Sequence, residues 1–290
     1  MTASRYRPEP QLRRPRGTGA SFLALAALFV SGLALGRPAC AQSAAAGAQQ
    51  TVAIAAAANL VYALDALDGA FAQAHPEIRL TNTTGASGTL VVQIRNGAPF
   101  DLFLSADLEF AQAMIRGGDA PASSMRTFAI GRLVLWTTKP GIDVSSVGIV
   151  VRNPAVQTIA IANPATAPYG LAAMQTLERL NLLESAQPKL VRGENISQTA
   201  AFVETGNADA GFVALSLVLS PKLRDRGRWV EVPPEDYAPL EQAAVLTRRG
   251  ASNPAAQAYL DFLGSPEARK ILGQFGYRLP AVASGKEGVP

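Results

Sequence analysis

The stretch VAIAAAANLVYALDALDGAFAQAHP (52–76) decides the fold of this chain. Its opening, Val52 to Ala55, is short and apolar and predicts a buried strand, after which leucines recur at helical spacing from Leu60 until His75-Pro76 ends the pattern. A second strand over 78–83, a short helix behind GASG (85–88) and a third strand over 100–104 repeat the unit. This alternation of strands and helices predicts a parallel sheet with helices on both faces.

The same alternation resumes after Arg126. The pattern predicts strands over 129–137, 158–162, 211–214, 228–232 and 243–247, and helices over 170–182, 197–206, 253–263 and 266–275. Because the chain exceeds one typical domain and no low-complexity linker divides it, we expect an α/β protein of two lobes, each with a mostly parallel sheet flanked by helices. Lobe I would comprise 42–132 and 243–290, lobe II 133–242, and a ligand cleft would lie between them.

The N-terminal segment has the pattern of a targeting signal. Its first part is rich in arginine, SFLALAALFVSGLAL (21–35) is uncharged, and Ala39-Cys40-Ala41 has the small-x-small pattern of a cleavage site. We predict a signal peptide over 1–41 that is cleaved near Ala41, and hence export to the periplasm. Lipid attachment at Cys40 is the alternative, and the pair Arg13-Arg14 leaves both the general and the twin-arginine export routes open.

The distribution of charge along the chain bears on whether it binds a nucleic acid. The chain of 290 residues has a net charge of +4, but residues 1–41 hold six arginines and one acid, Glu9, so the remainder is at −1. The basic isoelectric point therefore belongs to the N-terminal segment and gives no reason to expect a nucleic-acid partner. With 48% hydrophobic residues, the chain has ample material for a core, and beyond the targeting segment it has no second apolar run of membrane-spanning length.

The chain has few of the side chains that catalysis commonly uses, and this argues against an enzyme. The chain has one histidine, His75, at a predicted helix end, and one cysteine, Cys40. The GASG segment lacks the spacing of a nucleophile elbow, and neither a phosphate-binding glycine loop nor a set of zinc ligands is present. An exported serine hydrolase that uses Ser87 with His75 is the alternative from a different class.

Small polar residues occur where predicted strands give way to helices. Asn59 follows the first strand, Ser87 follows the second, Tyr169 opens a helix of the second half, and Ile196 opens the next one. Ligands bind at the carboxyl ends of parallel strands, and helix starts offer unpaired N–H groups and a partial positive charge. These positions predict an anion site without a cation. The alternatives are that Asn59 and Ser87 are ordinary helix N-caps, Tyr169 a packed aromatic and Ile196 a core residue.

Several segments in order resemble the periplasmic molybdate-binding proteins of ABC transporters, which are type II periplasmic solute-binding proteins. They are AIAAAANL (53–60), TGASGTL (84–90), GAPFDLFLSAD (97–107), ANPATAPYGLAA (162–173), GENISQTAAFV (193–203), AGFVAL (210–215) and FLGSPEARKILGQFGY (262–277). The resemblance implies the two-lobed periplasmic binding protein fold and the capture of molybdate, with tungstate as a second ligand. It also implies delivery to a membrane permease and a monomer without a cofactor.

The resemblance also implies a set of ligand residues. Matched position by position, the oxyanion-binding residues are Asn59 with Ala58, Ser87 with Ala86, Tyr169 and Ile196. Molybdenum would be held as molybdate through these residues, without a direct ligand to the metal ion. Many members of the family have a ligand tyrosine where this chain has Ala214, so we assign the phenol role to Tyr169.

The chemistry of the ligand agrees with this assignment. Molybdate and tungstate are dianions without protons at neutral pH and need only donors, whereas partly protonated phosphate gains from an acceptor such as a carboxylate. None of the proposed positions has a carboxylate, and we expect structural roles for Asp101 and Asp107. Sulfate remains an alternative ligand, as does ferric iron, which favours clustered tyrosine, histidine or carboxylate ligands.

Overall fold

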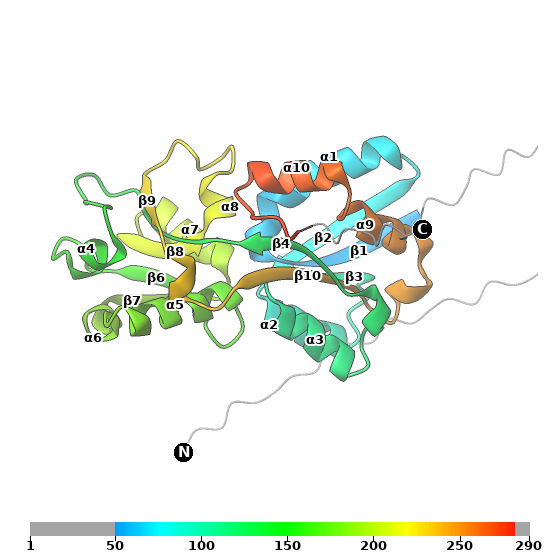
Figure 1. The fold of residues 1–290 in the computed structure, drawn as a ribbon, viewed down its shortest axis with the longest axis horizontal. Helices are drawn as coiled ribbons and strands as arrows, with labels where there is room; N and C mark the ends of the chain where they lie inside the picture. The colour runs from blue at the N-terminus through cyan, green and yellow to red at the C-terminus, as the bar shows by residue number, and fades with distance from the viewer. Residues whose placement is uncertain (1–49, 282–290) are drawn as a thin grey trace, which may run out of the picture. The chain divides into compact units, whose positions relative to one another are not determined.

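A computed structural model describes residues 50–281, and the predicted signal peptide lies outside the described residues. The described part contains two mixed sheets of five strands, in the orders β2-β1-β3-β10-β4 and β7-β6-β8-β5-β9 (Figure 1). Among the described residues, no helix has both the length and the apolar character that a membrane span requires. The two sheets form the cores of two lobes, which we call lobe I and lobe II.

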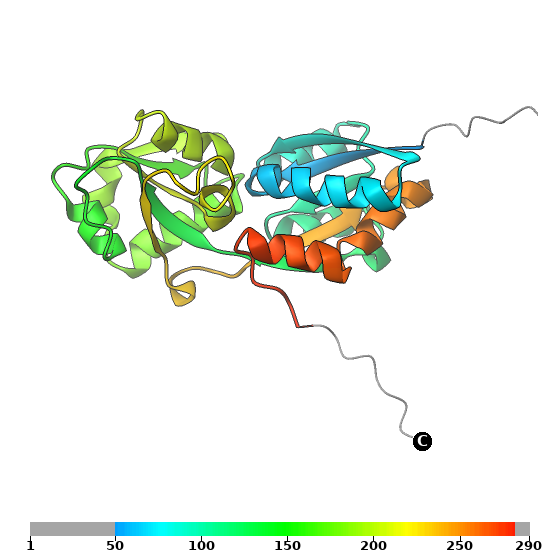
Figure 2. The ribbon, with the colours of Figure 1, turned by 90° about the horizontal axis from the view of Figure 1, so that it is seen from above.

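The sheet of lobe I combines parallel and antiparallel strands. Its strands are β1 (Gln50–Ala57), β2 (Ile78–Gly85), β3 (Leu102–Ser105), β4 (Arg126–Gly131) and β10 (Leu240–Leu246). Strand β1 pairs in parallel with β2 and β3, whereas β10 runs antiparallel to β3 and β4. One face is covered by α1 (Val61–Ala74), α9 (Pro254–Phe262) and α10 (Pro266–Gln274), the other by α2 (Ser87–Arg95) and α3 (Leu108–Arg116) (Figures 1 and 2).

Lobe II repeats this arrangement. Its strands are β5 (Leu133–Thr137), β6 (Ile159–Ala162), β7 (Leu190–Gly193), β8 (Ala210–Ala214) and β9 (Arg228–Glu231). Strand β6 is parallel to β7 and β8, and β5 is antiparallel to β8 and β9. The flanking helices are α4 (Val147–Arg152), α5 (Pro168–Arg179), α6 (Leu183–Ala186), α7 (Ile196–Glu204) and α8 (Leu215–Val218). In each sheet one strand, β10 or β5, thus runs opposite to the other four and pairs on its far side with an edge strand, β4 or β9.

The chain crosses between the sheets at two places. One crossing is Arg132, between β4 and β5, and the other is the segment 232–239, between β9 and β10. The predicted strand over 129–137 and the predicted lobe boundary at 132/133 already place a crossing here, but the strand is not continuous, because Arg132 separates β4 in one sheet from β5 in the other. The Arg132 guanidinium pairs with Glu231, the last residue of β9, and this ion pair holds the two crossings together. The sequence pattern also missed the helices α3, α4, α6 and α8 and the strand β7.

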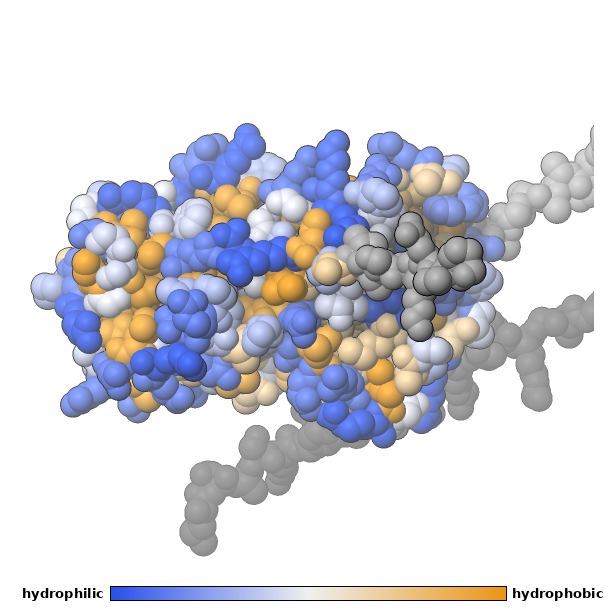
Figure 3. Space-filling view, in the orientation of Figure 1, coloured by the Kyte–Doolittle hydropathy of each residue, from blue (hydrophilic) through white to orange (hydrophobic). Residues whose placement is uncertain are grey.

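The surface carries few large apolar side chains. Figure 3 shows mostly hydrophilic residues around the periphery of the visible face, with apolar ones scattered between them. The large hydrophobic side chains exposed among the described residues are Val92, Ile149, Leu171 and Trp229, on different elements of both lobes. Apolar runs such as that of β1 are buried instead, with Val52 and Ile54 fully inaccessible to solvent. Because the buried strands pair in parallel, their carboxyl ends lie at the same edge of each sheet, together with the helix starts that follow them.

Candidate anion-binding site

A small cavity lies where the helix starts of the two lobes meet. The space open to the centre of a water-sized sphere is about 10 Å³, far below that of the cavities that hold drug-sized ligands. The lining residues are Ala57, Ala58, Asn59, Gly85, Ala86, Ser87, Ala106, Ala167, Pro168, Tyr169 and Ile196. All six residues predicted from the sequence are therefore in one cavity, four from lobe I and two from lobe II.

Ser87 presents a hydroxyl whose proton is available. It is the first residue of α2, whose N-cap is Ala86, so the N-cap alternative for Ser87 was wrong. The buried Oγ accepts a hydrogen bond from the backbone N–H of Ala106 at 3.1 Å. Because Oγ is the acceptor in that bond, its own O–H can donate to a ligand in the cavity.

The side chain of Asn59 is not a helix N-cap, so the N-cap alternative for this residue was wrong. It lies in the single 3₁₀ turn η1 (Ala58–Leu60) before α1 and makes no capping bond. Both protons of the buried Nδ2 are donated within lobe I, to Gln242 Oε1 and to the Tyr277 hydroxyl, each at 2.8 Å. The N–H groups of Ala58 and Asn59 open the turn and have no acceptor within it.

Tyr169 lines the cavity and carries a hydroxyl without a partner. Its side chain is only 2% exposed, yet the hydroxyl has no hydrogen-bond partner among the described residues. Burial raises the pKa of this phenol well above its ordinary value, so it stays protonated and is a potential donor. A buried hydroxyl without a partner is costly, and a bound acceptor would satisfy it.

Ile196 contributes its backbone. It is the first residue of α7, and the N-cap of this helix is Asn195, whose Oδ1 accepts from the N–H groups of Ser197 and Gln198 at 3.0 Å each. The cap leaves the N–H of Ile196 without a partner among the described residues. The backbone N–H groups of Ser87 and Tyr169, also in first turns, are in the same situation, and helix starts of this kind favour anions.

The lining contains no charged side chain. Asp101 is buried elsewhere, where its carboxylate accepts from the Ala53 N–H and from Arg249, each at 2.9 Å. Asp107 caps α3 by accepting from the Phe110 N–H, and burial raises the pKa of its carboxyl. Both acids thus have structural partners, and the polar groups of the cavity lining are neutral.

Hydrogen bonds join the lobes on either side of the cavity. The N–H of Gly88 donates to the carbonyl of Thr166 at 2.9 Å, and Ser216 Oγ donates to the carbonyl of Asn59 at 2.8 Å. Thr166 and Ser216 belong to lobe II, Gly88 and Asn59 to lobe I. The cavity is therefore enclosed by contacts between the lobes and is suited to a ligand that both lobes contact.

The hydrolase alternative finds no support in the geometry. His75 ends α1, stacks on Phe71 and pairs with Glu77 at 3.4 Å, and it does not line the cavity that contains Ser87. Among the described residues, no group of three or more His, Cys, Asp or Glu side chains could hold a metal ion. Ser87 consequently lacks the general base that a serine nucleophile needs.

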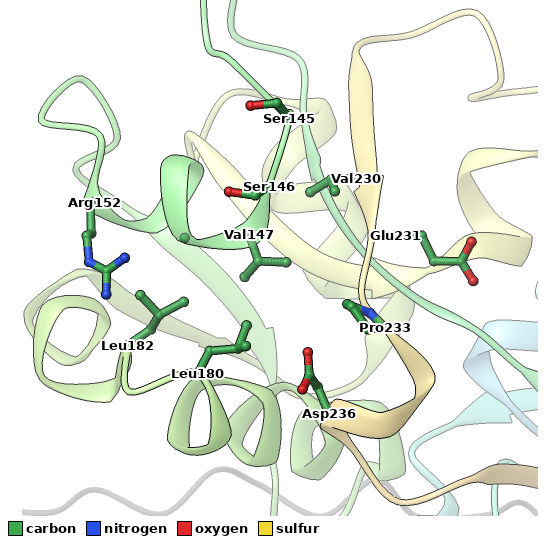
Figure 4. A pocket seen from close by; sticks show the side chains of 11 residues that line it. Ser145, Ser146, Val147, Arg152, Leu180, Leu182, Val230, Glu231, Pro233 and Asp236 are labelled. Atoms are coloured by element: carbon green, nitrogen blue, oxygen red, sulfur yellow. The ribbon is translucent and has the colours of Figure 1, made fainter.

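A second hollow lies in lobe II, away from these helix starts (Figure 4). Apolar side chains such as Val147 and Leu182 line it together with Arg152, Glu231 and Asp236. It contains none of the predicted residues, and its two carboxylates would repel an anion. We therefore take the cavity between the lobes as the candidate site.

Sequence reasoning missed the residues that support this cavity from behind. Gln242 on β10 is fully buried and binds Asn59, and Tyr277, in the tail after α10, is 5% exposed and does the same. Gln242 is a polar residue directly before the apolar run of β10, which was a detectable signal. Tyr277 is separated from Asn59 by 218 residues, and only the fold brings the two together.

Two lobes that enclose a small donor-lined cavity define a solute-binding protein. Residues 52–278 match the family model described as bacterial extracellular solute-binding protein, and the chain belongs to this family. The chain is 40% identical to the molybdate-binding protein ModA of Azotobacter vinelandii, with 87% of this chain and 97% of the relative covered. It is 43% identical to ModA of Rhodobacter capsulatus over 68% and 77% of the two chains.

The structural comparison agrees. The solved periplasmic molybdate-binding protein of Azotobacter vinelandii superposes with a TM-score of 0.74 at 35% identity, covering 79% of this chain and 99% of that chain. The two-lobed periplasmic binding protein fold expected from the sequence is thus confirmed. Members of the family are transport components that bind solutes, and the chain is not an enzyme.

Proposed function

We propose that this chain captures molybdate outside the cytoplasm and delivers it to an ABC transporter. The observation that carries the proposal is the cavity itself, which contains a free hydroxyl, an unpartnered phenol and unpaired helix-start N–H groups but no charged side chain. Such a set of donors suits an anion that has no proton to donate. The two ModA relatives, at 40% and 43% identity, support molybdate as that anion.

The proposed ligands are the hydroxyls of Ser87 and Tyr169 and the backbone N–H groups of Ala58, Asn59, Ser87, Tyr169 and Ile196, with Ala86 shaping the wall. Hydrogen bonds to a charged partner contribute about 1.5–3 kcal/mol each, so several of them are sufficient for sub-micromolar affinity. Tungstate has the same charge and tetrahedral shape, and we propose it as a second ligand. Molybdenum would make no direct bond to the protein.

The proposal includes the organisation and location of the protein. We propose that residues 1–41 form a signal peptide cleaved near Ala41, that the mature protein is a periplasmic monomer, and that its partner is the permease. Lobe I would comprise 42–132 and 243–290, and lobe II 133–242. The sheet memberships support this division, although β10 already begins at Leu240 within the lobe I sheet.

Sulfate is the competing ligand. It is also a dianion without protons at neutral pH, and only the size of the cavity would distinguish it from molybdate. Phosphate is disfavoured because the lining offers no carboxylate to accept its proton, and ferric iron because the lining has one tyrosine and neither histidine nor carboxylate.

Thermal unfolding of the purified chain with each anion tests the proposal. After dialysis to remove ligand, molybdate and tungstate at a hundredfold excess over the dissociation constant stabilise the chain by about 2.7 kcal/mol. For a chain of this size the midpoint rises by roughly 5–10 °C. Sulfate and phosphate are expected to give no shift. A shift with sulfate alone, or with none of the four anions, would overturn the assignment.

A further inference from the structure

A buried network of four polar side chains lies directly behind the candidate anion site. Its members are Asn59 in η1, Gln242 on β10, Tyr277 after α10, and Ser216 on α8. Their exposed fractions are 1%, 0%, 5% and 4%. The first three belong to lobe I and Ser216 belongs to lobe II, so the network extends across the boundary between the lobes.

Asn59 is the centre of this network. Its amide donates to Gln242 and to Tyr277, and its carbonyl accepts from Ser216 Oγ at 2.8 Å and from the Tyr277 hydroxyl at 3.1 Å. Both protons of the side-chain amide are thus engaged away from the cavity. The hydrogen bonds to the side chain and to the carbonyl together fix the position of Asn59, and with it the turn whose N–H groups line the cavity.

Gln242 connects Asn59 with Ala106, another residue of the cavity lining. While its Oε1 accepts from Asn59, its Nε2 donates to the carbonyls of Ala106 at 2.9 Å and Leu240 at 3.0 Å. Ala106 in turn donates its N–H to Ser87 Oγ. One continuous series of hydrogen bonds therefore leads from Tyr277 through Asn59, Gln242 and Ala106 to Ser87. Asn59 Oδ1 has no partner among the described residues, but the other side-chain polar atoms of this series are hydrogen-bonded, and buried series of this kind orient the groups at their ends.

Tyr277 joins this series to lobe II. Its hydroxyl lies 3.2 Å from Ser216 Oγ, and Ser216 itself donates to Asn59. Because Ser216 is on the other lobe, these bonds require the lobe separation seen here. A shift of α8 away from η1 would break them and leave the carbonyl of Asn59 with the Tyr277 hydroxyl as its one remaining partner among these residues.

We propose that Tyr277 and Gln242 are positioning residues for the anion site, and that Ser216 couples the position of Asn59 to the closure of the lobes. This inference rests on the proposed function only for the identity of the anion. Tyr277 and Gln242 do not line the cavity, and they act through Asn59 and Ser87.

The test compares two buried tyrosines of lobe I. Tyr277→Phe keeps the ring and removes the hydroxyl that binds Asn59 and Ser216. Tyr259→Phe is the matched control, since Tyr259 is fully buried and its hydroxyl donates to Asp68 at 2.6 Å, outside the network. Calorimetric titration with molybdate is expected to give an affinity at least tenfold weaker for Tyr277→Phe and within twofold of wild type for Tyr259→Phe. Both variants lower the unfolding midpoint of the ligand-free chain.

Equal affinity losses in both variants, or none in Tyr277→Phe, would overturn the positioning role, because a merely structural tyrosine affects stability alone. Ser216→Ala gives a second comparison. Combined with Tyr277→Phe, its loss of affinity should be less than additive, because both substitutions disrupt the same connection. Fully additive losses would contradict the coupling.

A measurement without ligand separates this inference from the proposed function. Amide hydrogen exchange of the ligand-free chain should become faster in both η1 and α8 of Tyr277→Phe, and in neither element of Tyr259→Phe. If wild type binds no oxyanion but this exchange pattern appears, the proposed function fails and the network stands. If molybdate binds but exchange in α8 is unchanged, the network does not couple the lobes.

Discussion

The hydroxyl of Tyr169 occupies the space beside Gly131 that any other residue would fill. A Cβ atom on residue 131 would lie 2.1 Å from that hydroxyl oxygen and 3.0 Å from Gln242 Nε2. Gly131 ends β4 in lobe I, whereas Tyr169 opens α5 in lobe II. The absence of a side chain at position 131 thus permits the phenol of one lobe to reach the strand of the other.

Gly131→Ala should weaken anion binding, because the added methyl displaces the Tyr169 ring from a closely packed position. We expect a loss of at least tenfold in molybdate affinity, measured by calorimetry, with a folded chain. Gly69→Ala is the control, since a Cβ at Gly69 in α1 meets no atom within 4 Å. That variant should retain full affinity and gain about 0.5–1 kcal/mol of stability. Unchanged affinity in Gly131→Ala would show that Tyr169 does not need this position.

Tyr169→Phe should have opposite effects on stability and on binding. Without ligand the phenol has no partner, so its removal leaves the midpoint unchanged or raises it. With ligand, the loss of one charge-assisted bond should weaken affinity roughly 10- to 100-fold. Tyr237→Phe is the comparison, because the Tyr237 hydroxyl accepts from the Leu133 N–H at 3.2 Å. That variant should lose stability and keep affinity, and the reverse pattern would refute the role of Tyr169.

Ser87→Ala should reduce stability and affinity together. The substitution leaves the buried N–H of Ala106 without its partner, at a cost of about 1–3 kcal/mol, and removes a donor from the cavity. Ser146→Ala removes a comparable acceptor, the cap that accepts from the Ile149 N–H at 3.2 Å, and should affect stability alone. Wild type should hydrolyse no ester substrate. Ester turnover that Ser87→Ala abolishes would revive the hydrolase alternative.

Alkaline pH should destabilise the chain through its buried tyrosines. Burial raises the pKa of Tyr169, Tyr259 and Tyr277 above the ordinary 10.0. Above pH 10 the unfolded chain loses phenolic protons that the folded chain retains, so stability falls as pH rises and is fully present below that value. Each tyrosine contributes a slope of about 1.4 kcal/mol per pH unit. Urea unfolding between pH 8 and 11.5 measures how the free energy of unfolding falls with pH. The Tyr259→Phe variant should reduce the slope of this fall by the contribution of one tyrosine.

Much of the site could be predicted because its signals are local. Asn59, Ser87, Tyr169 and Ile196 each follow a predicted strand and begin a helical segment, and the rule that ligands bind at the carboxyl ends of parallel strands brings such positions together. The roles of the individual side chains were harder to predict from the sequence. Asn59 and Ser87 were both plausible N-caps, and the choice between capping and distant partners depends on neighbours far away in the sequence.

The break at Arg132 shows the same limit for the fold. The apolar run on both sides of Arg132 predicts one strand at the boundary between the lobes, and periodicity alone does not show that the run is broken into two strands. That division follows from pairing: β4 bonds to β10, whereas β5 bonds to β8 and β9. Strand pairing over such separations is absent from any local pattern.

The sequence by itself determined the alternation of strands and helices, the two-lobed class and the neutral character of the site, because propensity, periodicity and the types of side chain are local properties. Only the tertiary structure decided that Gln242, Tyr277 and Ser216 surround Asn59, and that Gly131 makes room for Tyr169. These contacts join residues up to 218 positions apart. Their existence depends on how the strands pair and how the lobes meet, and this is a property of the packed chain as a whole.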